Sequence, residues 1–236
     1  MPRFSYDHEI LERFPAVVGG IIHASGVTNG SAPAELTAAY RAEQSAVTER
    51  IGNTPLSELP TLTAWRSVFR SFGVNPTKYR SAAEALLRRL TKQGDIPSIN
   101  VLVDLANLVS IRYALPVAVF DQRGVVGGTT VRLAHGGEPW ADLGSSETEH
   151  PEPGEVIVAD DDEQVSARRW CWRQSRASAA RDDTTEILVT VEGHQPAAPD
   201  DVDRALRDLD ALLGTYAAPT TVTSDILDSG NPAFSR

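Results

Sequence analysis

The sequence is poor in cysteine. Its single cysteine, Cys171, cannot form a disulfide within the chain, and no second cysteine or suitably spaced histidine accompanies it to bind zinc. The five histidines are scattered along the chain without metal-ligand spacing. We therefore expect no metal and no other cofactor, and we expect Cys171 to be a packing residue.

Long apolar runs are also missing. The N-terminus has no positively charged segment followed by an apolar one, and no stretch approaches the roughly 18 apolar residues of a membrane span. We expect a cytoplasmic protein with no membrane partner. With 236 residues, 41% of them hydrophobic, the chain is long enough to bury the core of one compact domain. We expect this domain to occupy residues 1–218 and a loosely held polar tail to occupy residues 219–236.

Positive charge is scarce and unevenly distributed. The net charge of −10 argues against a protein that coats nucleic acid nonspecifically, because phosphate contacts need Lys and Arg. Residues 61–135 nevertheless hold ten Lys or Arg against four acids, a balance of +6, so the rest of the chain carries −16. This middle segment is where a polyanion would dock. Alternatively, its arginines form internal ion pairs with Glu84, Asp104 and Asp121.

The hydrophobic pattern changes from helical to strand-like near Pro116. A strand at residues 16–22 comes first, and four helices are then predicted, at residues 33–52, 60–73, 81–94 and 99–114. The third helix begins at Ser81 and Glu84, which have the spacing of a capping box. Five strands follow, at residues 117–121, 125–134, 155–160, 166–174 and 186–193, and the last helix is predicted at residues 200–213.

Five short motifs occur in a fixed order between Gly73 and Gly193. They are residues 73–90, 99–110, 115–121, 131–134 and 137–138. In this order they resemble the B3/B4 domain of the bacterial phenylalanyl-tRNA synthetase β subunit and of freestanding B3/B4 proteins. The resemblance implies a three-layer α+β fold, with helices packed over a β-sandwich-like arrangement of sheets, which agrees with the order of helices and strands in the sequence.

The resemblance also implies a function. In the synthetase, this domain hydrolyses the ester between a misplaced amino acid and the tRNA 3′ end, as the second sieve of double-sieve editing. The reaction needs an oriented water, acceptors for the α-ammonium and donors for the developing oxyanion, and no nucleophilic triad is visible here. The chain is therefore predicted to be a trans-acting aminoacyl-tRNA deacylase whose partner is the acceptor end of an aminoacyl-tRNA.

Several polar residues are site candidates under this resemblance. Asn107 matches an Asp-x-x-Asn motif of the family and is predicted to be the amide that orients the substrate. Asp104 on the same apolar helix is predicted to be a structural partner of Arg88 or Arg89, because burying an unpaired carboxylate is unfavourable. Among the cations, three are predicted to bind tRNA: Lys78, Arg80 and Arg132. For Arg80 and Arg132 a role in bracing the fold stays open.

Two departures from the family pattern affect the predicted pocket. Ala118 stands where the synthetase has a histidine, and bulky or cationic residues at 168–175 replace a glycine-rich segment. An amino acid smaller than tyrosine, or differently shaped, is therefore expected to fit better. The predicted substrate-binding residues are Ala118, Trp170, Arg173, Gln174 and Ser175. Trp170 and Trp172 are expected to alternate with Cys171 along one strand.

Two other functions stay open. A non-catalytic module that binds an amino acid or aminoacyl-nucleotide would keep the pocket while the loss of the histidine at Ala118 removes turnover. The third possible function is hydrolysis of an unrelated small ester or amide, and metal dependence of the activity would distinguish it from the other two. The amino acid, the tRNA and the oligomeric state do not follow from the sequence.

Overall fold

The structure, a computed structural model, describes residues 3–145 and 147–235. Its helices are α1 (His8–Arg13), α2 (Ala34–Ile51), α3 (Pro60–Ser71), α4 (Ala82–Gln93), α5 (Val101–Tyr113) and α6 (Ala198–Tyr216). Its strands are β1 (Phe4–Tyr6), β2 (Val18–Ser25), β3 (Val117–Asp121), β4 (Thr129–Leu133), β5 (Val156–Asp160), β6 (Val165–Arg168), β7 (Arg173–Gln174), β8 (Glu186–Gly193), β9 (Thr221–Leu227) and β10 (Ala233–Phe234). In the described part of the chain, no helix has the length and apolar character needed to cross a membrane.

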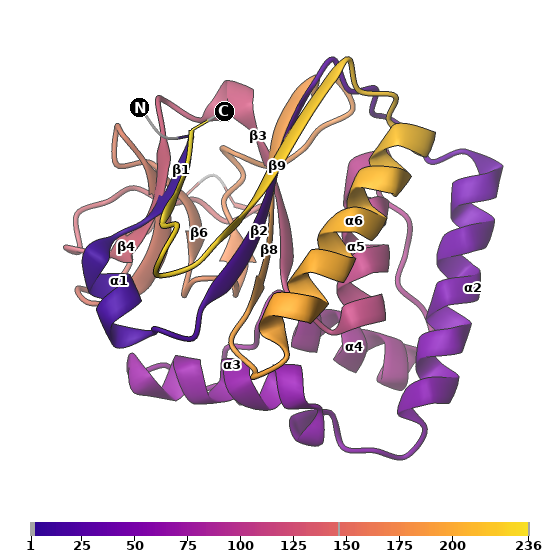
Figure 1. Cartoon of the computed structure of the whole chain (residues 1–236), viewed down its shortest axis with the longest axis horizontal. Coiled ribbons are helices and arrows are strands. Elements are labelled where there is room, and N and C mark those ends of the chain that lie inside the picture. The colour runs from indigo at the N-terminus through magenta and orange to yellow at the C-terminus, as the bar shows by residue number, and fades with distance from the viewer. Residues whose placement is uncertain (1–2, 146, 236) are drawn as a thin grey trace.

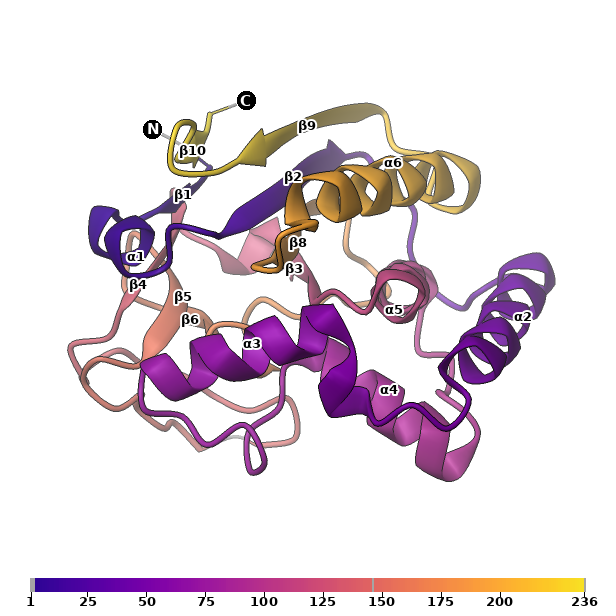
Figure 2. The ribbon, with the colours of Figure 1, turned by 60° about the horizontal axis from the view of Figure 1, so that its bottom comes forward.

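The strands form two sheets. One has four strands in the order β3-β8-β2-β9, and the other has six in the order β10-β1-β4-β5-β6-β7. In the four-stranded sheet, β2 pairs antiparallel with β8 over its whole length and with β9 on its other side. Figure 2 shows β9 alongside β2, with α6 packed across the neighbouring face of the sheet.

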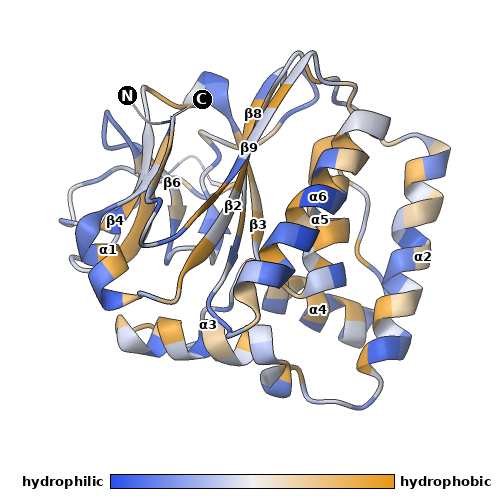
Figure 3. Cartoon of the chain, in the orientation of Figure 1, coloured by the Kyte–Doolittle hydropathy of each residue, from blue (hydrophilic) through white to orange (hydrophobic). Residues whose placement is uncertain are grey.

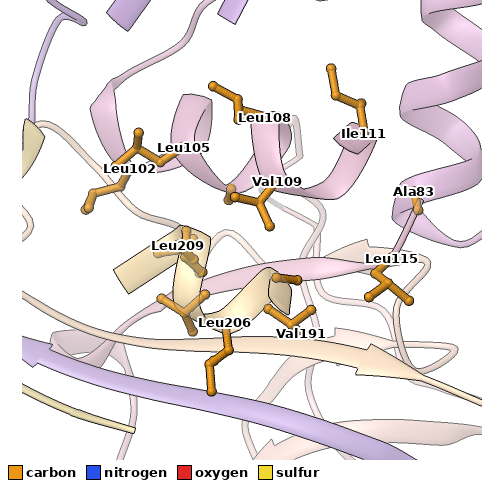
Figure 4. Packing of buried hydrophobic residues seen from close by; sticks show 14 of the residues in the cluster. Ala83, Leu102, Leu105, Leu108, Val109, Ile111, Leu115, Val191, Leu206 and Leu209 are labelled. Carbon is orange, nitrogen blue, oxygen red and sulfur yellow. The ribbon is translucent and has the colours of Figure 1, made fainter. Parts of the chain in front are cut away.

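The sheets and helices are stacked in three layers. The helices α5 and α6 pack on one face of the four-stranded sheet, and α2 and α4 pack against α5 (Figure 1). In that layer Val109 of α5 points toward Leu206 of α6 and Val191 of β8 (Figure 4). The other face of this sheet packs against the six-stranded sheet, and α3 adds Trp65 and Phe69 at the margin. Orange, hydrophobic residues accordingly cover much of β3 and α5 (Figure 3). The predicted three-layer α+β fold is confirmed.

Local sequence signals explain where the helix before the site begins and ends. The Ser81 hydroxyl accepts a hydrogen bond from the Glu84 backbone N–H at 3.3 Å, which caps the first turn of α4. The helix ends at Gly94, whose φ of +83° lies in the left-handed region that glycine tolerates. The bounds predicted from these residues are confirmed, and α4 is fixed at the edge of the site described below.

Two segments differ from the sequence-based prediction. Residues 166–174 are not one strand, because β6 ends at Arg168 and a turn at 169–172 leads into the short strand β7. The predicted alternation of Trp170 and Trp172 on a strand is therefore wrong. The prediction of a loosely held C-terminal tail is also wrong, because β9 pairs with β2 and β10 pairs with β1. Phe234 at the end of this segment is 1% exposed.

Candidate functional site

A cavity of about 70 Å³ lies between the two sheets, beneath the turn at residues 169–172. Its walls are mostly apolar, with Ala118 and Phe120 from β3, Val158 from β5, and Trp170 from the turn. The polar part of the lining comes from Thr190 and Glu192 of β8 and from Arg173 and Gln174 of β7. A small apolar cavity with a few convergent polar groups is the usual form of a ligand site.

The turn that covers the cavity has an unusual backbone. Arg169 and Trp170 have φ values of +49° and +61°, a region in which a side chain costs of order 1–3 kcal/mol. Neighbouring elements hold this conformation. The Trp170 N–H donates to the Val156 carbonyl at 2.7 Å, and the Ala82 N–H donates to the Cys171 carbonyl at 2.8 Å. Such strained backbone is concentrated at functional sites, which is consistent with a site at this turn.

Aromatic packing fixes the Trp170 indole in the cavity wall. Its ring meets Trp65, Phe14 and His194 edge to face, with centroids 5.3, 5.2 and 5.0 Å away. Its Nε1 donates a hydrogen bond to Glu192 at 2.9 Å. Trp170 is 1% exposed, so this part of the wall is rigid and its shape is set by buried neighbours.

Glu192 is the most unusual polar residue of the cavity, because it is 4% exposed and has no cationic partner among the described residues. Its Oε1 accepts hydrogen bonds from the Tyr6 hydroxyl at 2.7 Å and from Trp170 Nε1 at 2.9 Å. Within the described chain, no hydrogen bond reaches Oε2. Burial raises the pKa of Glu192, against the opposing effect of the two hydrogen bonds. One oxygen of a buried acid is thus left for a ligand.

Glycine at position 19 makes the contact between Tyr6 and Glu192 possible. Gly19 lies opposite Glu192 in the pairing of β2 with β8. A Cβ at Gly19 would lie 2.1 Å from the Tyr6 hydroxyl oxygen, which real Cβ contacts do not allow. The missing side chain therefore leaves room for the phenol that positions Glu192.

A wider groove of about 590 Å³ adjoins the cavity, and Trp172 and Arg173 line both. Six cations line this groove: Lys78, Arg80, Arg88, Arg89, Lys92 and Arg173. The Arg169 guanidinium lies over both the Tyr79 and the Trp172 ring, 3.8 and 4.5 Å from their centroids. A basic groove with partly exposed aromatic rings is typical of surfaces that bind single-stranded nucleic acid.

Among the residues that the structure describes, half of the groove's cations have no carboxylate partner. Arg173 pairs with Asp142, Arg89 with Asp95 at 3.6 Å, and Arg80 lies 3.8 Å from Glu84. The structure records no ion pair for the other three among the described residues, namely Lys78, Arg88 and Lys92. These three charges are therefore the ones most available to a polyanion.

The structure brings most of the predicted substrate-binding residues together. Ala118, Trp170, Arg173 and Gln174 all line the cavity. Ser175 does not. It is fully buried, and its hydroxyl donates to the Ala141 carbonyl at 3.3 Å, which places it behind the wall.

Two of the three predicted tRNA-binding residues, Lys78 and Arg80, line the groove. Arg132 instead donates to Glu138 at 2.6 Å, and Glu138 is fully buried. Burial alone would raise the pKa of Glu138, but hydrogen bonds from the His135 backbone N–H and from Arg132 lower it to about 2. Of the two roles predicted for Arg132, the structure therefore supports the bracing one.

Asn107 lies on α5 and is not among the residues that line the cavity. It is near Tyr40 of α2. Burial and Asp104 raise the pKa of Tyr40, and the Asn107 amide has the opposite effect. Asp104 accepts hydrogen bonds from the Ser98 hydroxyl and, at 2.8 Å, from the Ile99 N–H. The structural role predicted for Asp104 fits these contacts, but the predicted pairing with Arg88 or Arg89 is wrong.

Glu192 was not identified from the sequence, although a signal for it exists. Side chains two residues apart on a strand share a face, so Leu188, Thr190 and Glu192 of β8 point the same way. Because Leu188 faces the core between the sheets, the acid at Glu192 had to be buried. The signal is an acidic residue at an even spacing from core residues along one strand, which places it on the buried face. Among the described residues, no group of three or more His, Cys, Asp or Glu side chains is placed to hold a metal ion.

The B3/4 domain family matches residues 64–213, which is more than half of the chain. The protein therefore belongs to the B3/4 domain family, and the resemblance identified in the sequence is confirmed. Its relatives include the phenylalanine–tRNA ligase beta subunit of Bradyrhizobium diazoefficiens, at 34% identity over 116 residues, or 49% of this chain and 14% of that subunit. The same subunit of Chromobacterium violaceum is 32% identical over 77 residues, or 33% of this chain and 10% of the subunit.

Among solved structures, an N-terminal fragment of the phenylalanyl-tRNA synthetase β-subunit from Pyrococcus horikoshii matches 94% of this chain and 49% of the fragment. The TM-score is 0.45 and the sequence identity is 12%. The chain thus spans less than a sixth of the curated ligase subunits that it matches, and about half of the solved fragment.

Proposed function

We propose that this protein is a trans-acting aminoacyl-tRNA deacylase, which acts in the cytoplasm and removes a wrong amino acid from tRNA by directing water onto the ester. One observation carries the proposal: a small cavity with an unpaired buried acid adjoins a basic, aromatic groove at Trp172 and Arg173. An aminoacyl-tRNA 3′ end has the matching two parts, a cationic amino acid and a single-stranded polyanion. The relation to synthetase β subunits supports the same substrate class.

In this proposal the groove docks the acceptor end. The phosphates meet the unpaired charges of Lys78, Arg88 and Lys92, and the terminal bases stack near Tyr79 and Trp172. The amino acid then enters the cavity past Trp172 and Arg173. The ester itself lies at this boundary, where the Arg173 guanidinium is placed to stabilise negative charge on the carbonyl oxygen.

Gln174 is the residue best placed to orient the attacking water. Its Nε2 donates to the carbonyls of Val119 and Ser178, at 2.6 and 2.9 Å, which holds the amide in one orientation. Its Oε1 accepts no hydrogen bond from any described residue, and Gln174 is one of the residues that line the cavity. An amide oxygen held in this way positions a water, and orientation of this kind supplies much of the rate of an activated ester's hydrolysis.

The test is a panel of radiolabelled aminoacyl-tRNAs, cognate and mischarged, incubated with the purified protein and followed for ester loss. We expect selective hydrolysis of one or a few species, unchanged by a chelator and reduced at least about tenfold by Gln174→Ala. Gln122→Ala, in the turn after β3 and outside the cavity lining, is the matched control. A flat panel from a protein shown to be folded would overturn the proposal.

A second function is favoured by one observation in the cavity wall. Ala118 lines the cavity at the position where the family's synthetase domain has a histidine. A module that binds the amino acid or aminoacyl-nucleotide without turnover would need no such group. Tight binding of a non-hydrolysable aminoacyl-adenosine, combined with no ester loss from any aminoacyl-tRNA, would select this function over the first.

A further inference from the structure

We infer that the cavity selects primary amines of small size, namely α-amino acids with short side chains, and that Oε2 of Glu192 receives their α-ammonium group. The inference deepens the proposed function and rests on it for the tRNA ester. The recognition of the amine itself rests only on the cavity.

The first argument is size. A cavity of about 150 Å³ holds a benzene ring, and this cavity, at about 70 Å³, has less than half that volume. A phenyl or phenol side chain therefore does not fit without movement of the wall. That wall consists of Phe120, Val158 and Trp170, which are between 1% and 3% exposed. Moving close-packed side chains of this kind costs free energy, so aromatic amino acids are excluded from the cavity.

The second argument is charge. A buried carboxylate without a cation is unfavourable, and the two hydrogen bonds to Glu192 both end on Oε1. A primary ammonium supplies a positive charge and three donors, whereas an amide or an acylated amine supplies one neutral donor. The free Oε2 therefore favours a free α-amino group. A neutral ligand of the same size would leave this oxygen unpaired.

The third argument concerns how Glu192 is held. Tyr6 comes from β1 and Trp170 from the turn, so two different elements fix the carboxylate from one side. Glu192 lines the cavity next to Thr190 on the same face of β8. The acid is thus pre-positioned, and binding an ammonium requires no further ordering of this side chain.

The test measures binding rather than turnover. The probes are non-hydrolysable 3′-aminoacylamino-3′-deoxyadenosines that carry alanine, serine, tyrosine or N-acetylalanine, titrated into the full chain by calorimetry. We expect the alanine and serine probes to bind at least about tenfold more tightly than the other two, because tyrosine is too large for the cavity and N-acetylalanine has no ammonium group for Glu192. Equal affinity for alanine and tyrosine overturns the size argument, and equal affinity for alanine and N-acetylalanine overturns the role of Glu192.

Two variants make the test specific. Glu192→Gln keeps an acceptor for Tyr6 and Trp170 and should weaken the alanine probe about tenfold or more while leaving the N-acetylalanine probe unchanged. Val158→Ala should enlarge the cavity and improve a valine probe relative to alanine. Val131→Ala, which is buried in the same sheet but outside the cavity lining, should not. If each variant, with its fold confirmed by circular dichroism, leaves all probe affinities at wild-type values, the inference is wrong.

The outcomes also separate the inference from the proposed function. If small-amine probes bind as expected but no aminoacyl-tRNA is hydrolysed, the deacylase proposal fails and the inference stands. If tyrosyl-tRNA is hydrolysed as fast as alanyl- or seryl-tRNA, the deacylase proposal stands and the inference fails.

Discussion

At the residue scale, Asn107 and Glu192 illustrate how much depends on the direction of one polar side chain. Both are polar residues in elements that are mostly apolar, α5 and β8 respectively. Asn107 lies on α5, within the helical layer, and does not line the cavity. Glu192 is directed into the cavity between the sheets. The motif around Asn107 made it the stronger candidate in the sequence, but a motif does not state which face of a helix meets the ligand.

Replacing Asn107 tests this difference directly. We expect Asn107→Ala to change the deacylation rate less than about twofold, because Asn107 does not line the cavity, and to lower the free energy of unfolding by about 1 kcal/mol. Single-turnover hydrolysis and urea unfolding of the same preparation measure the two effects. A severe loss of hydrolysis in a protein of normal stability would instead restore Asn107 as the substrate-orienting residue.

His194 gives a prediction about acid stability. Its ring is buried beside Trp65 and Trp170, and burial lowers its pKa from 6.5 to about 3. Below pH 6.5 the unfolded chain binds a proton here that the folded chain does not bind. The stability contributed by the neutral ring is therefore complete above pH 6.5 and is lost progressively as the pH falls toward 3.

The variant His194→Phe keeps an aromatic ring and removes this titration. Between pH 6 and pH 4, we expect the free energy of unfolding of the wild type to fall relative to the variant by about 1.4 kcal/mol per pH unit at most. Urea denaturation at several pH values measures the difference, and the carboxylates common to both proteins cancel. Parallel curves for the two proteins would show that the His194 ring titrates normally.

At the element scale, the helix α4 carries the groove's charge. Arg88 lies on this helix, lines the groove and has no carboxylate partner among the described residues. We expect Arg88→Ala to weaken tRNA binding and to reduce the slope of log K against log salt by about 0.7–0.9, the value for one phosphate contact. Filter binding at several salt concentrations measures this slope.

Two other arginines serve as controls for that experiment. Arg207→Ala removes a charge from α6, outside the groove, and should leave the slope unchanged. Arg132→Gln should also leave the slope unchanged while it destabilises the fold by about 3 kcal/mol, because it breaks the pair with the buried Glu138. A slope that responds to Arg207 or Arg132 as strongly as to Arg88 would show that the groove is not the docking surface.

The same scale shows which elements could be predicted from the sequence. The helices α2, α3 and α4 and the strands β3 and β8 end where local signals place them, at Gly52, Gly73, Gly94 and the ends of apolar runs. The turn at 169–172 could not be predicted, because bulky residues there adopt positive φ through contacts with Val156 and Ala82. Four of the five predicted cavity residues line the cavity: Ala118 lies on β3, Arg173 and Gln174 lie on β7, and Trp170 lies in this turn.

At the scale of the whole molecule, the charge that is unevenly distributed along the sequence is also unevenly distributed in the structure. The chain carries −10 overall, while the groove beside α4 gathers six cations. Acidic residues elsewhere repel a polyanion, so the groove is the surface on which a tRNA end is favoured. Under the proposed function, this charge distribution would let a net acidic protein bind tRNA weakly and at one place, and release correctly charged tRNA.

The C-terminal strands complete the molecule and give the last prediction. Strand β9 is largely exposed and polar, so its sequence shows no clear alternation, and only its pairing with β2 reveals it. Leu227 and Phe234 nevertheless bury their side chains in the core between the sheets. That core also contains Tyr6 and Trp170, the two donors to Glu192. The C-terminal segment therefore stabilises the core that holds the Glu192 donors, without lining the cavity itself.

We expect a chain that ends at Ala218 to lose cooperative folding, because truncating a single buried Phe or Leu to Ala already costs about 2–5 kcal/mol.

Phe234→Ala should lower the free energy of unfolding by about 3 kcal/mol and weaken the alanine probe, since β10 pairs with β1, which carries Tyr6. Ser224→Ala on β9, an exposed position outside that core, is the matched control and should do neither. Thermal unfolding followed by calorimetry separates these cases. A shortened chain that melts at the wild-type temperature would show that the folded domain ends at residue 218, as first expected from the sequence.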